Sequence, residues 1–221
     1  MATTVEAKTR EPVPAPLAPS QPWYQAHQRY LLAALIVLVL AGIVGWFVIA
    51  SGKRKEQFAV RSLNQARAAA EAGNLPLASS ELQRLITTYK GTGAANEAVI
   101  TLNQVRLENG QSELAVVGLR DFLATKPAPK YVASASGLLG AAQENAKRWV
   151  DAANAYSVAS NAAEVPYLKA AYLVDAGRAF RQAGKLEEAQ RVYRTVLEKY
   201  PETPSFTEAQ VRLAELTDGK M

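Results

Sequence analysis

The sequence predicts an all-α protein: one N-terminal transmembrane helix, an α-solenoid of four helical hairpins, and a C-terminal capping helix. Two observations lead to this prediction. A stretch of 20 residues near the N-terminus, Leu31 to Ala50, contains no charged side chain. Further on, four alanines recur every 37 residues, at Ala78, Ala115, Ala152 and Ala189. A fixed period of this length indicates one supersecondary unit that is copied and stacked side by side.

Residues 1–28 form a proline-rich tail, with prolines at positions 12, 14, 16, 19 and 22. Proline fixes φ and has no N–H to donate, so we expect an extended, disordered segment. The alternative is an arm that docks along a partner.

Residues 29–52 are the expected transmembrane helix. At about 1.5 Å per residue, 20 apolar residues match the roughly 30 Å of a bilayer core. Aromatic residues flank the run, with Tyr30 before it and Trp46 near its end, as is typical of membrane interfaces. The run is too long for the core of a cleaved signal peptide.

Residues 53–58 are the expected basic juxtamembrane linker. Lys53, Arg54 and Lys55 follow the apolar run directly, whereas only Arg29 lies close to its other end. The positive-inside rule therefore places the C-terminal body in the cytoplasm. The periplasmic orientation stays open, because long domains are translocated despite their flanking charge. The same three cations are candidates for binding anionic headgroups at the membrane surface.

Residues 59–201 contain the four repeats, each predicted to be a first helix, a turn and a second helix. Gly73, Gly110 and Gly184 lie five residues before three of the alanines, and Lys147 takes this place in the other copy. Glycine ends helices by adopting the left-handed conformation. Each alanine marks the crossing of two helices, and the space beside it is filled by a larger residue four positions later: Leu82, Leu119, Tyr156 or Tyr193.

The fourth copy, with the stretch GKLEEAQRVYRTVLEKYP and its flanking Gly177 and Phe180, closely resembles the tetratricopeptide repeat (TPR) family. The other copies match less fully, because Arg106 and Gln143 replace the usual aromatic of the first helix. The period of 37 exceeds the usual 34, which implies longer connections between hairpins. Residues 202–221 supply a helix over Ser205 to Thr217 that we expect to cap the array.

The resemblance implies that the first helices line a concave groove that binds protein segments. Carrying over the family's positions gives a mixed-charge surface, basic at both ends and acidic in the middle, suited to a mixed-charge helix or extended segment. Ordinary solvated helix faces are the alternative. The candidate groove residues are Arg67, Glu71, Gln104, Glu108, Glu144, Asn145, Arg178 and Arg181.

The composition argues against catalysis. The chain has no cysteine and one histidine, His27, which excludes thiolate metal sites and a Ser-His-Asp triad in the body. No phosphate loop or paired-carboxylate motif is present, so we expect neither an enzyme nor a cofactor. The net charge is +5, but residues from Phe58 onward carry 19 basic and 17 acidic side chains, only +2. This distribution does not favour nucleic acid as a partner.

The sequence combines an expected membrane anchor with an array suited to docking, and it carries no catalytic motif. This combination indicates a scaffold or accessory subunit that assembles or stabilises a larger membrane protein complex. Its partners would be other protein subunits and the lipid bilayer. The layout also resembles the bacterial YfgM-like accessory proteins of the secretion translocon, whose bodies are regarded as periplasmic. That resemblance implies the alternative function, a chaperone-like protein that binds clients near the translocon. Either function places the chain in the bacterial inner membrane.

Overall fold

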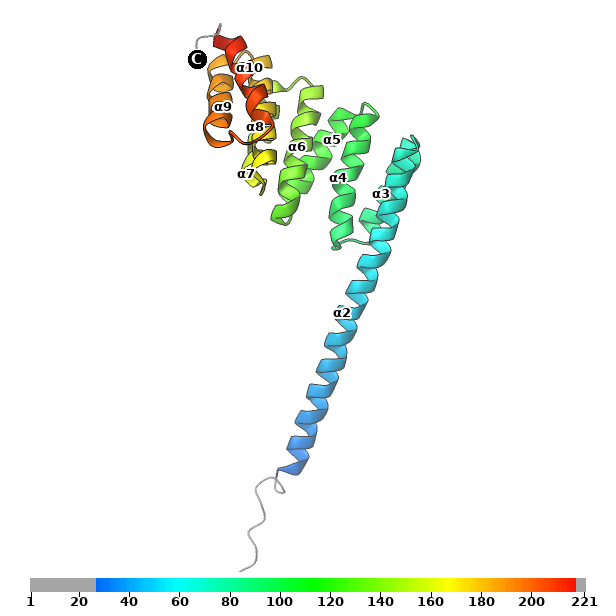
Figure 1. Cartoon of the computed structure of the whole chain (residues 1–221). Coiled ribbons are helices and arrows are strands. Elements are labelled where there is room, and N and C mark those ends of the chain that lie inside the picture. Colours follow the sequence, from blue (N-terminus) through cyan, green and yellow to red (C-terminus); the bar gives the residue numbers. More distant parts are fainter. Residues whose placement is uncertain (1–26, 218–221) are drawn as a thin grey trace, which may run out of the picture. The chain divides into compact units, whose positions relative to one another are not determined.

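The computed structural model describes residues 27–217, and nearly all of the proline-rich tail lies outside this range. Within it the chain is helical throughout and contains no strand. The described residues divide into two units, the first ending at Ser51 and the second beginning at Gly52. The helices, labelled in Figure 1, are α2 (Gln28–Glu71), α3 (Leu75–Thr88), α4 (Gly93–Glu108), α5 (Ser112–Ala124), α6 (Pro129–Asn145), α7 (Trp149–Ala162), α8 (Pro166–Gln182), α9 (Leu186–Lys199) and α10 (Ser205–Thr217).

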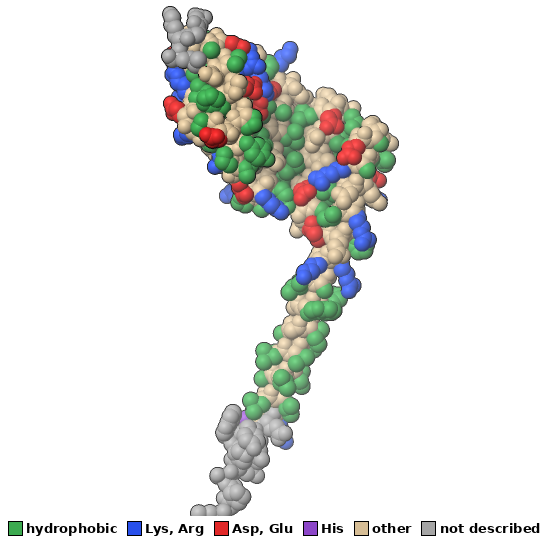
Figure 2. All heavy atoms as spheres, viewed as in Figure 1, with side chains coloured by type: hydrophobic (Ala, Val, Ile, Leu, Met, Phe, Trp, Pro, Cys, Tyr) green, Lys and Arg blue, Asp and Glu red, His purple; other side chains and the backbone are tan. Residues whose placement is uncertain are grey.

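The described part of the first unit is the N-terminal portion of α2. Its large apolar side chains, from Leu31 to Ile49, are exposed along the helix, as the green surface in Figure 2 shows. Of the described helices, α2 alone is long and apolar enough to cross a membrane. Residues 53–58, the expected linker, are helical because α2 continues without a break to Glu71. These residues contain no proline, and the glycine directly before them, Gly52, is itself helical.

The second unit is a stack of four hairpins: the end of α2 with α3, α4 with α5, α6 with α7, and α8 with α9 (Figure 1). The three turn glycines adopt φ between +73° and +79°, and Lys147 adopts φ +58° in the third hairpin. These residues end the first helices in the left-handed conformation, so the predicted role of the turn positions is confirmed. Lys147 does so with a side chain, at the cost of the strain that glycine avoids.

The core confirms the 37-residue pattern. The four recurring alanines are fully buried, and so is Tyr193. In the fourth hairpin the Tyr193 ring lies on Gly177, where a Cβ would come within 2.5 Å of the ring. Tyr156 lies on Gly140 in the same way, at 2.7 Å. The large residue of the second helix is thus accommodated by a missing side chain on the first.

The first two hairpins fill the same space differently. Positions equivalent to Gly140 and Gly177 hold Ala66 and Asn103, and the opposing tyrosine is replaced by the smaller Leu82 and Leu119. All four of these residues are buried. Where the second helix carries a smaller side chain, the first helix carries a larger one. The interior therefore stays filled, although the pair of residue types differs between hairpins.

Helix α10 packs on α8 and α9 at the C-terminal end of the stack. Its Ala209 and Leu213 are buried in one apolar cluster with Ala189, Tyr193 and Val196. This covers apolar surface that the last hairpin would otherwise expose.

Candidate functional site

Three successive first helices, α2, α4 and α6, enclose a cleft of about 700 Å³ in the second unit. Its charged lining consists of two cations and three carboxylates, with apolar and hydroxyl groups between them. The lining residues are Arg67, Ala70 and Glu71 of α2, Glu97, Ile100, Thr101, Gln104, Val105 and Glu108 of α4, and Lys130, Tyr131 and Ser134 of α6.

Four of the predicted groove residues meet in this cleft: Arg67, Glu71, Gln104 and Glu108. The Arg67 guanidinium donates to the carboxylate of Glu97 at 3.1 Å, linking α2 to α4. The Gln104 amide donates to Glu108 at 3.1 Å, one turn further along α4. Glu71 and Glu108 are exposed, which leaves carboxylate oxygens in the cleft to accept bonds from a ligand.

The α6 wall of the cleft is formed by Lys130 and Tyr131. Tyr131 is buried, packs edge-on against Phe122 with ring centroids 6.5 Å apart, and donates its hydroxyl to the Gly93 carbonyl at 3.3 Å. The Lys130 ammonium lies 4.8 Å from the centroid of the Tyr131 ring, within cation–π range. The tyrosine is thus held in place by the fold, while the lysine stays exposed at the mouth of the cleft.

The cleft is lined by α2, α4 and α6, and α8 contributes no residue to its lining. The Tyr172 ring of α8 covers Gly137 of α6 so closely that a Cβ there would lie 2.5 Å from it. Gly137 is thus buried where α6 packs against α8. On α6 the cleft is lined by Lys130, Tyr131 and Ser134, all near the N-terminus of that helix.

The predicted residues of the last two copies are placed outside the cleft, and most are paired within the fold. Arg178 donates to Glu144 at 2.9 and 3.3 Å and pairs with Asp175 at 2.9 Å. The Tyr156 hydroxyl donates to the same Glu144 at 2.8 Å. The Glu144 side chain is only 16% exposed, so this network joins α6, α7 and α8. Asn145 is exposed at the end of α6.

Burial and pairing shift the pKa values in this network. Burial raises the pKa of the Asp175 carboxyl, and the nearby Arg178 offsets this only in part. Burial and the bond to Glu144 raise the pKa of Tyr156, and the bond to Glu144 raises the pKa of Arg178. Arg181 pairs separately with Glu215 of α10 at 2.7 Å. These groups stabilise the array and leave little capacity for a ligand.

The three cations that follow the apolar run have different contacts. All three are exposed, and the Lys55 ammonium also donates to the carbonyl of Lys90 at 2.9 Å. The next residue, Glu56, accepts the backbone N–H groups of Gly93 and Ala94 at 2.8 and 2.9 Å. Its carboxylate thus satisfies two free donors at the N-terminus of α4 and complements that helix dipole.

Sequence reasoning missed Glu56, Glu97, Lys130 and Tyr131. The repeat period contains a signal for two of them, since Glu56, Gly93 and Lys130 are each 37 residues apart and so hold equivalent places in successive repeats. For Glu97 and Tyr131 no such signal exists. In the part of the chain that the structure describes, no three metal-binding side chains gather.

Comparison with known proteins supports the repeat type. Residues 171–203, most of α8 and all of α9, match the model of the tetratricopeptide repeat family. MamA shares the fold at a TM-score of 0.57 and 17% identity, over 70% of this chain and 84% of MamA. The body is therefore a tetratricopeptide-type solenoid.

Two further structures agree. Nearly identical TPR-like repeats of a putative kinesin light chain from Podosopora anserina give a TM-score of 0.59 at 17% identity, covering 72% of this chain and 85% of that one. A tetratricopeptide repeat protein from Parabacteroides merdae gives 0.58 at 13% identity, covering 73% and 61%. No curated protein sequence matches the chain. Solenoids of this kind generally act as non-enzymatic scaffolds that bind protein partners along extended surfaces.

Proposed function

We propose that this protein is a membrane-anchored scaffold or accessory subunit that assembles or stabilises a larger membrane protein complex. The observation that carries this proposal is the cleft of about 700 Å³ across α2, α4 and α6, with exposed carboxylates at Glu71 and Glu108. A partner segment that presents a cation between apolar side chains would satisfy both the acidic and the apolar lining. The partner is a protein subunit, and no cofactor is required.

The anchor is residues 29–52 of α2. Its apolar side chains are exposed along the helix, and exposing them to water would cost about 25 cal/mol for each Å². A bilayer removes this cost. The cations that follow favour a cytoplasmic body in a bacterial inner membrane, with the periplasmic orientation as the alternative. Protease treatment of spheroplasts distinguishes the two, because only a periplasmic body is digested before lysis.

The function is tested by affinity purification of the tagged full chain from native membranes in mild detergent, with partner stoichiometry measured. The cleft variant is Glu71→Lys with Glu108→Lys. The matched control, Glu187→Lys with Glu198→Lys, makes the same charge change on exposed positions of α9.

We expect a few stoichiometric partners with the native chain and the control, and their loss with the cleft variant. Many substoichiometric clients, retained by crosslinking alone, would instead support the translocon-associated chaperone. The scaffold is ruled out if deleting the gene leaves every membrane complex unchanged on native gels.

A further inference from the structure

Cations gather along the edge of the solenoid where its first helices begin. This basic edge comprises the start of the second unit, the α3–α4 and α5–α6 connections, and the first turn of α6. Its six members are all exposed: Lys53, Arg54, Lys55, Lys90, Lys126 and Lys130. Lys53 and Lys90 are 37 residues apart and thus occupy equivalent places in neighbouring repeats.

Direct contacts hold the edge together. The bond from Lys55 to the Lys90 carbonyl joins α2 to the α3–α4 connection. Glu56 joins α2 to the first residues of α4, and the Tyr131 hydroxyl joins those residues to α6 through the Gly93 carbonyl. Residues 55 and 56 of α2 and the N-termini of α4 and α6 therefore lie on one connected edge, with Lys130 beside Tyr131.

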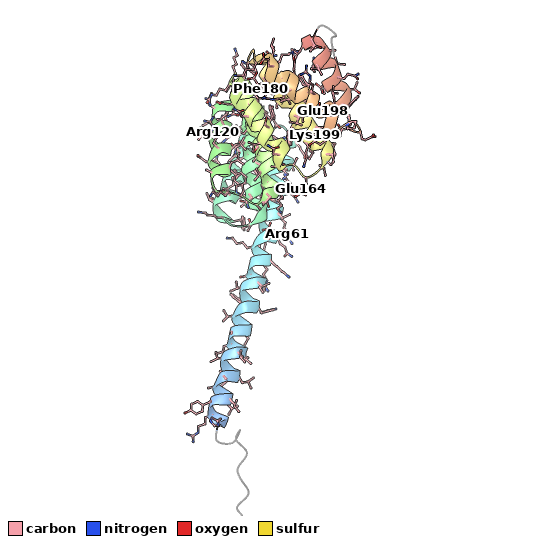
Figure 3. All side chains as sticks on the ribbon, turned by 90° about the vertical axis from the view of Figure 1, so that its left-hand side faces the viewer. Arg61, Arg120, Glu164, Phe180, Glu198 and Lys199 are labelled. Atoms are coloured by element: carbon pink, nitrogen blue, oxygen red, sulfur yellow. The ribbon has the colours of Figure 1, made fainter. Side chains whose placement is uncertain are left out.

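The charge on this edge is unbalanced. Its carboxylate, Glu56, is occupied by two backbone N–H groups. One turn deeper, Arg61 of α2, labelled in Figure 3, adds a further cation and lies 5.7 Å from the Phe58 ring centroid. At the same depth in α4, the Glu97 carboxylate is paired with Arg67 at 3.1 Å. The opposite edge of the first two hairpins carries Glu71 and Glu108, and its turns at 72–74 and 109–111 contain no lysine or arginine. The first half of the array is thus basic on one edge and acidic on the other.

We propose that the basic edge docks on the bilayer surface by binding anionic phospholipid headgroups. This rests on the proposed membrane span. Lys53 follows the apolar run by three residues and so lies at headgroup level, and the edge continues from it through Lys90 to Lys130. Clusters of four to eight cations next to a span are typical of binding to anionic lipid.

Lipid fits this edge better than an acidic protein segment does. Its connections present Gly91, Pro127, Ala128 and Pro129, and they lack the exposed aromatic anchors on which protein interfaces rely. The exposed ring beside the edge, Phe58 of α2, has the Arg61 guanidinium over its face. Docking leaves the acidic edge, with Glu71 and Glu108, facing away from the repelling membrane charge. The acidic lining of the cleft is then open to a protein partner while the array stays on the membrane.

The test uses the full chain reconstituted in vesicles. Because the chain has no cysteine, a single one at Ala128 on the basic edge carries an environment-sensitive fluorophore without background. Cysteine at Asn109 labels the opposite edge as a control. A lipid with a nitroxide on its headgroup quenches the fluorophore where the protein contacts the bilayer surface. Quenching is measured in vesicles of phosphatidylcholine alone and in vesicles with 30% phosphatidylglycerol.

The charge variant is Lys90→Gln, Lys126→Asn and Lys130→Gln, with asparagine chosen because Lys126 has φ +53°. The matched control removes three cations elsewhere: Lys147→Asn, at φ +58°, Arg191→Gln and Arg194→Gln. We expect quenching at position 128 in anionic vesicles only, lost at 1 M salt and in the charge variant. Each lysine near the surface contributes a factor of roughly five, so three reduce docking about a hundred-fold.

Three outcomes overturn docking: no quenching at position 128, quenching there that is independent of anionic lipid, and equal losses in the charge and control variants. Flotation of the vesicles after carbonate extraction shows whether the chain is anchored, so a failure of docking can be told apart from a failure of the proposed span. A chain that floats but is not quenched refutes docking alone, whereas a chain that does not float refutes the span and, with it, the docking.

Discussion

Replacing each of two equivalent tyrosines by phenylalanine should change the stability of the solenoid in opposite directions. Tyr156 and Tyr193 hold the same place in the third and fourth hairpins, each with its ring on a glycine. The Tyr156 hydroxyl donates to Glu144 at 2.8 Å. The Tyr193 hydroxyl is buried and has no hydrogen-bond partner among the described residues. One oxygen atom is removed in each case, so only its bonding differs.

The magnitudes follow from that difference. A hydrogen bond to a charged group contributes about 1.5–3 kcal/mol, so Tyr156→Phe should cost about 1.5 kcal/mol, since Glu144 keeps both bonds from Arg178. Burying a hydroxyl without a partner costs about 1–3 kcal/mol, so Tyr193→Phe should gain about 1 kcal/mol. With a urea dependence near 2 kcal/mol per M, the two midpoints should differ by about 1 M.

The assay is urea unfolding of the full chain in non-ionic detergent, followed by circular dichroism. The apolar part of α2 stays helical in the micelle and contributes a constant signal to both variants. If Tyr193→Phe destabilises the protein as much as Tyr156→Phe does, the Tyr193 hydroxyl has a partner, such as a buried water, and the reasoning is wrong.

Three further predictions use the same measurement. Lys147→Gly should stabilise the array by about 1 kcal/mol, because glycine adopts the positive φ without strain; a loss would show that the lysine side chain contributes more than its strain costs. Glu56→Ala should cost about 1–2 kcal/mol by freeing two N–H groups of α4, whereas Glu198→Ala, an exposed change, should cost under about 0.5 kcal/mol. The raised pKa of Asp175 means that the folded chain binds more protons than the unfolded chain, so unfolding free energy should fall as pH rises from 3.8 through the folded-state pKa. Asp175→Asn should remove this pH dependence of the unfolding free energy. If the dependence is unchanged, it arises from other titrating groups.

The repeated core could be predicted because its positions need the same property in every copy. A buried alanine at a helix crossing and a left-handed residue at a turn follow from local geometry, so they recur at 37 residues. Lys147 shows that the backbone requirement persists even where the residue type changes. The limits of the cleft could not be predicted in this way. They depend on contacts between repeats, such as the Tyr172 ring of α8 that packs over Gly137 of α6.

The two halves of the array share the 37-residue core pattern but differ in the contacts of their charged side chains. In the last two hairpins Glu144, Arg178 and Arg181 are paired with neighbouring helices, so their charges stabilise the stack. In the first two, Glu71 and Glu108 remain exposed beside an open cleft. Charges committed to internal pairs gain little from a ligand, because breaking a pair offsets what the new contact contributes. Partner recognition should therefore concentrate in the half of the solenoid that directly follows the apolar run, and substitutions there should change binding with little loss of stability.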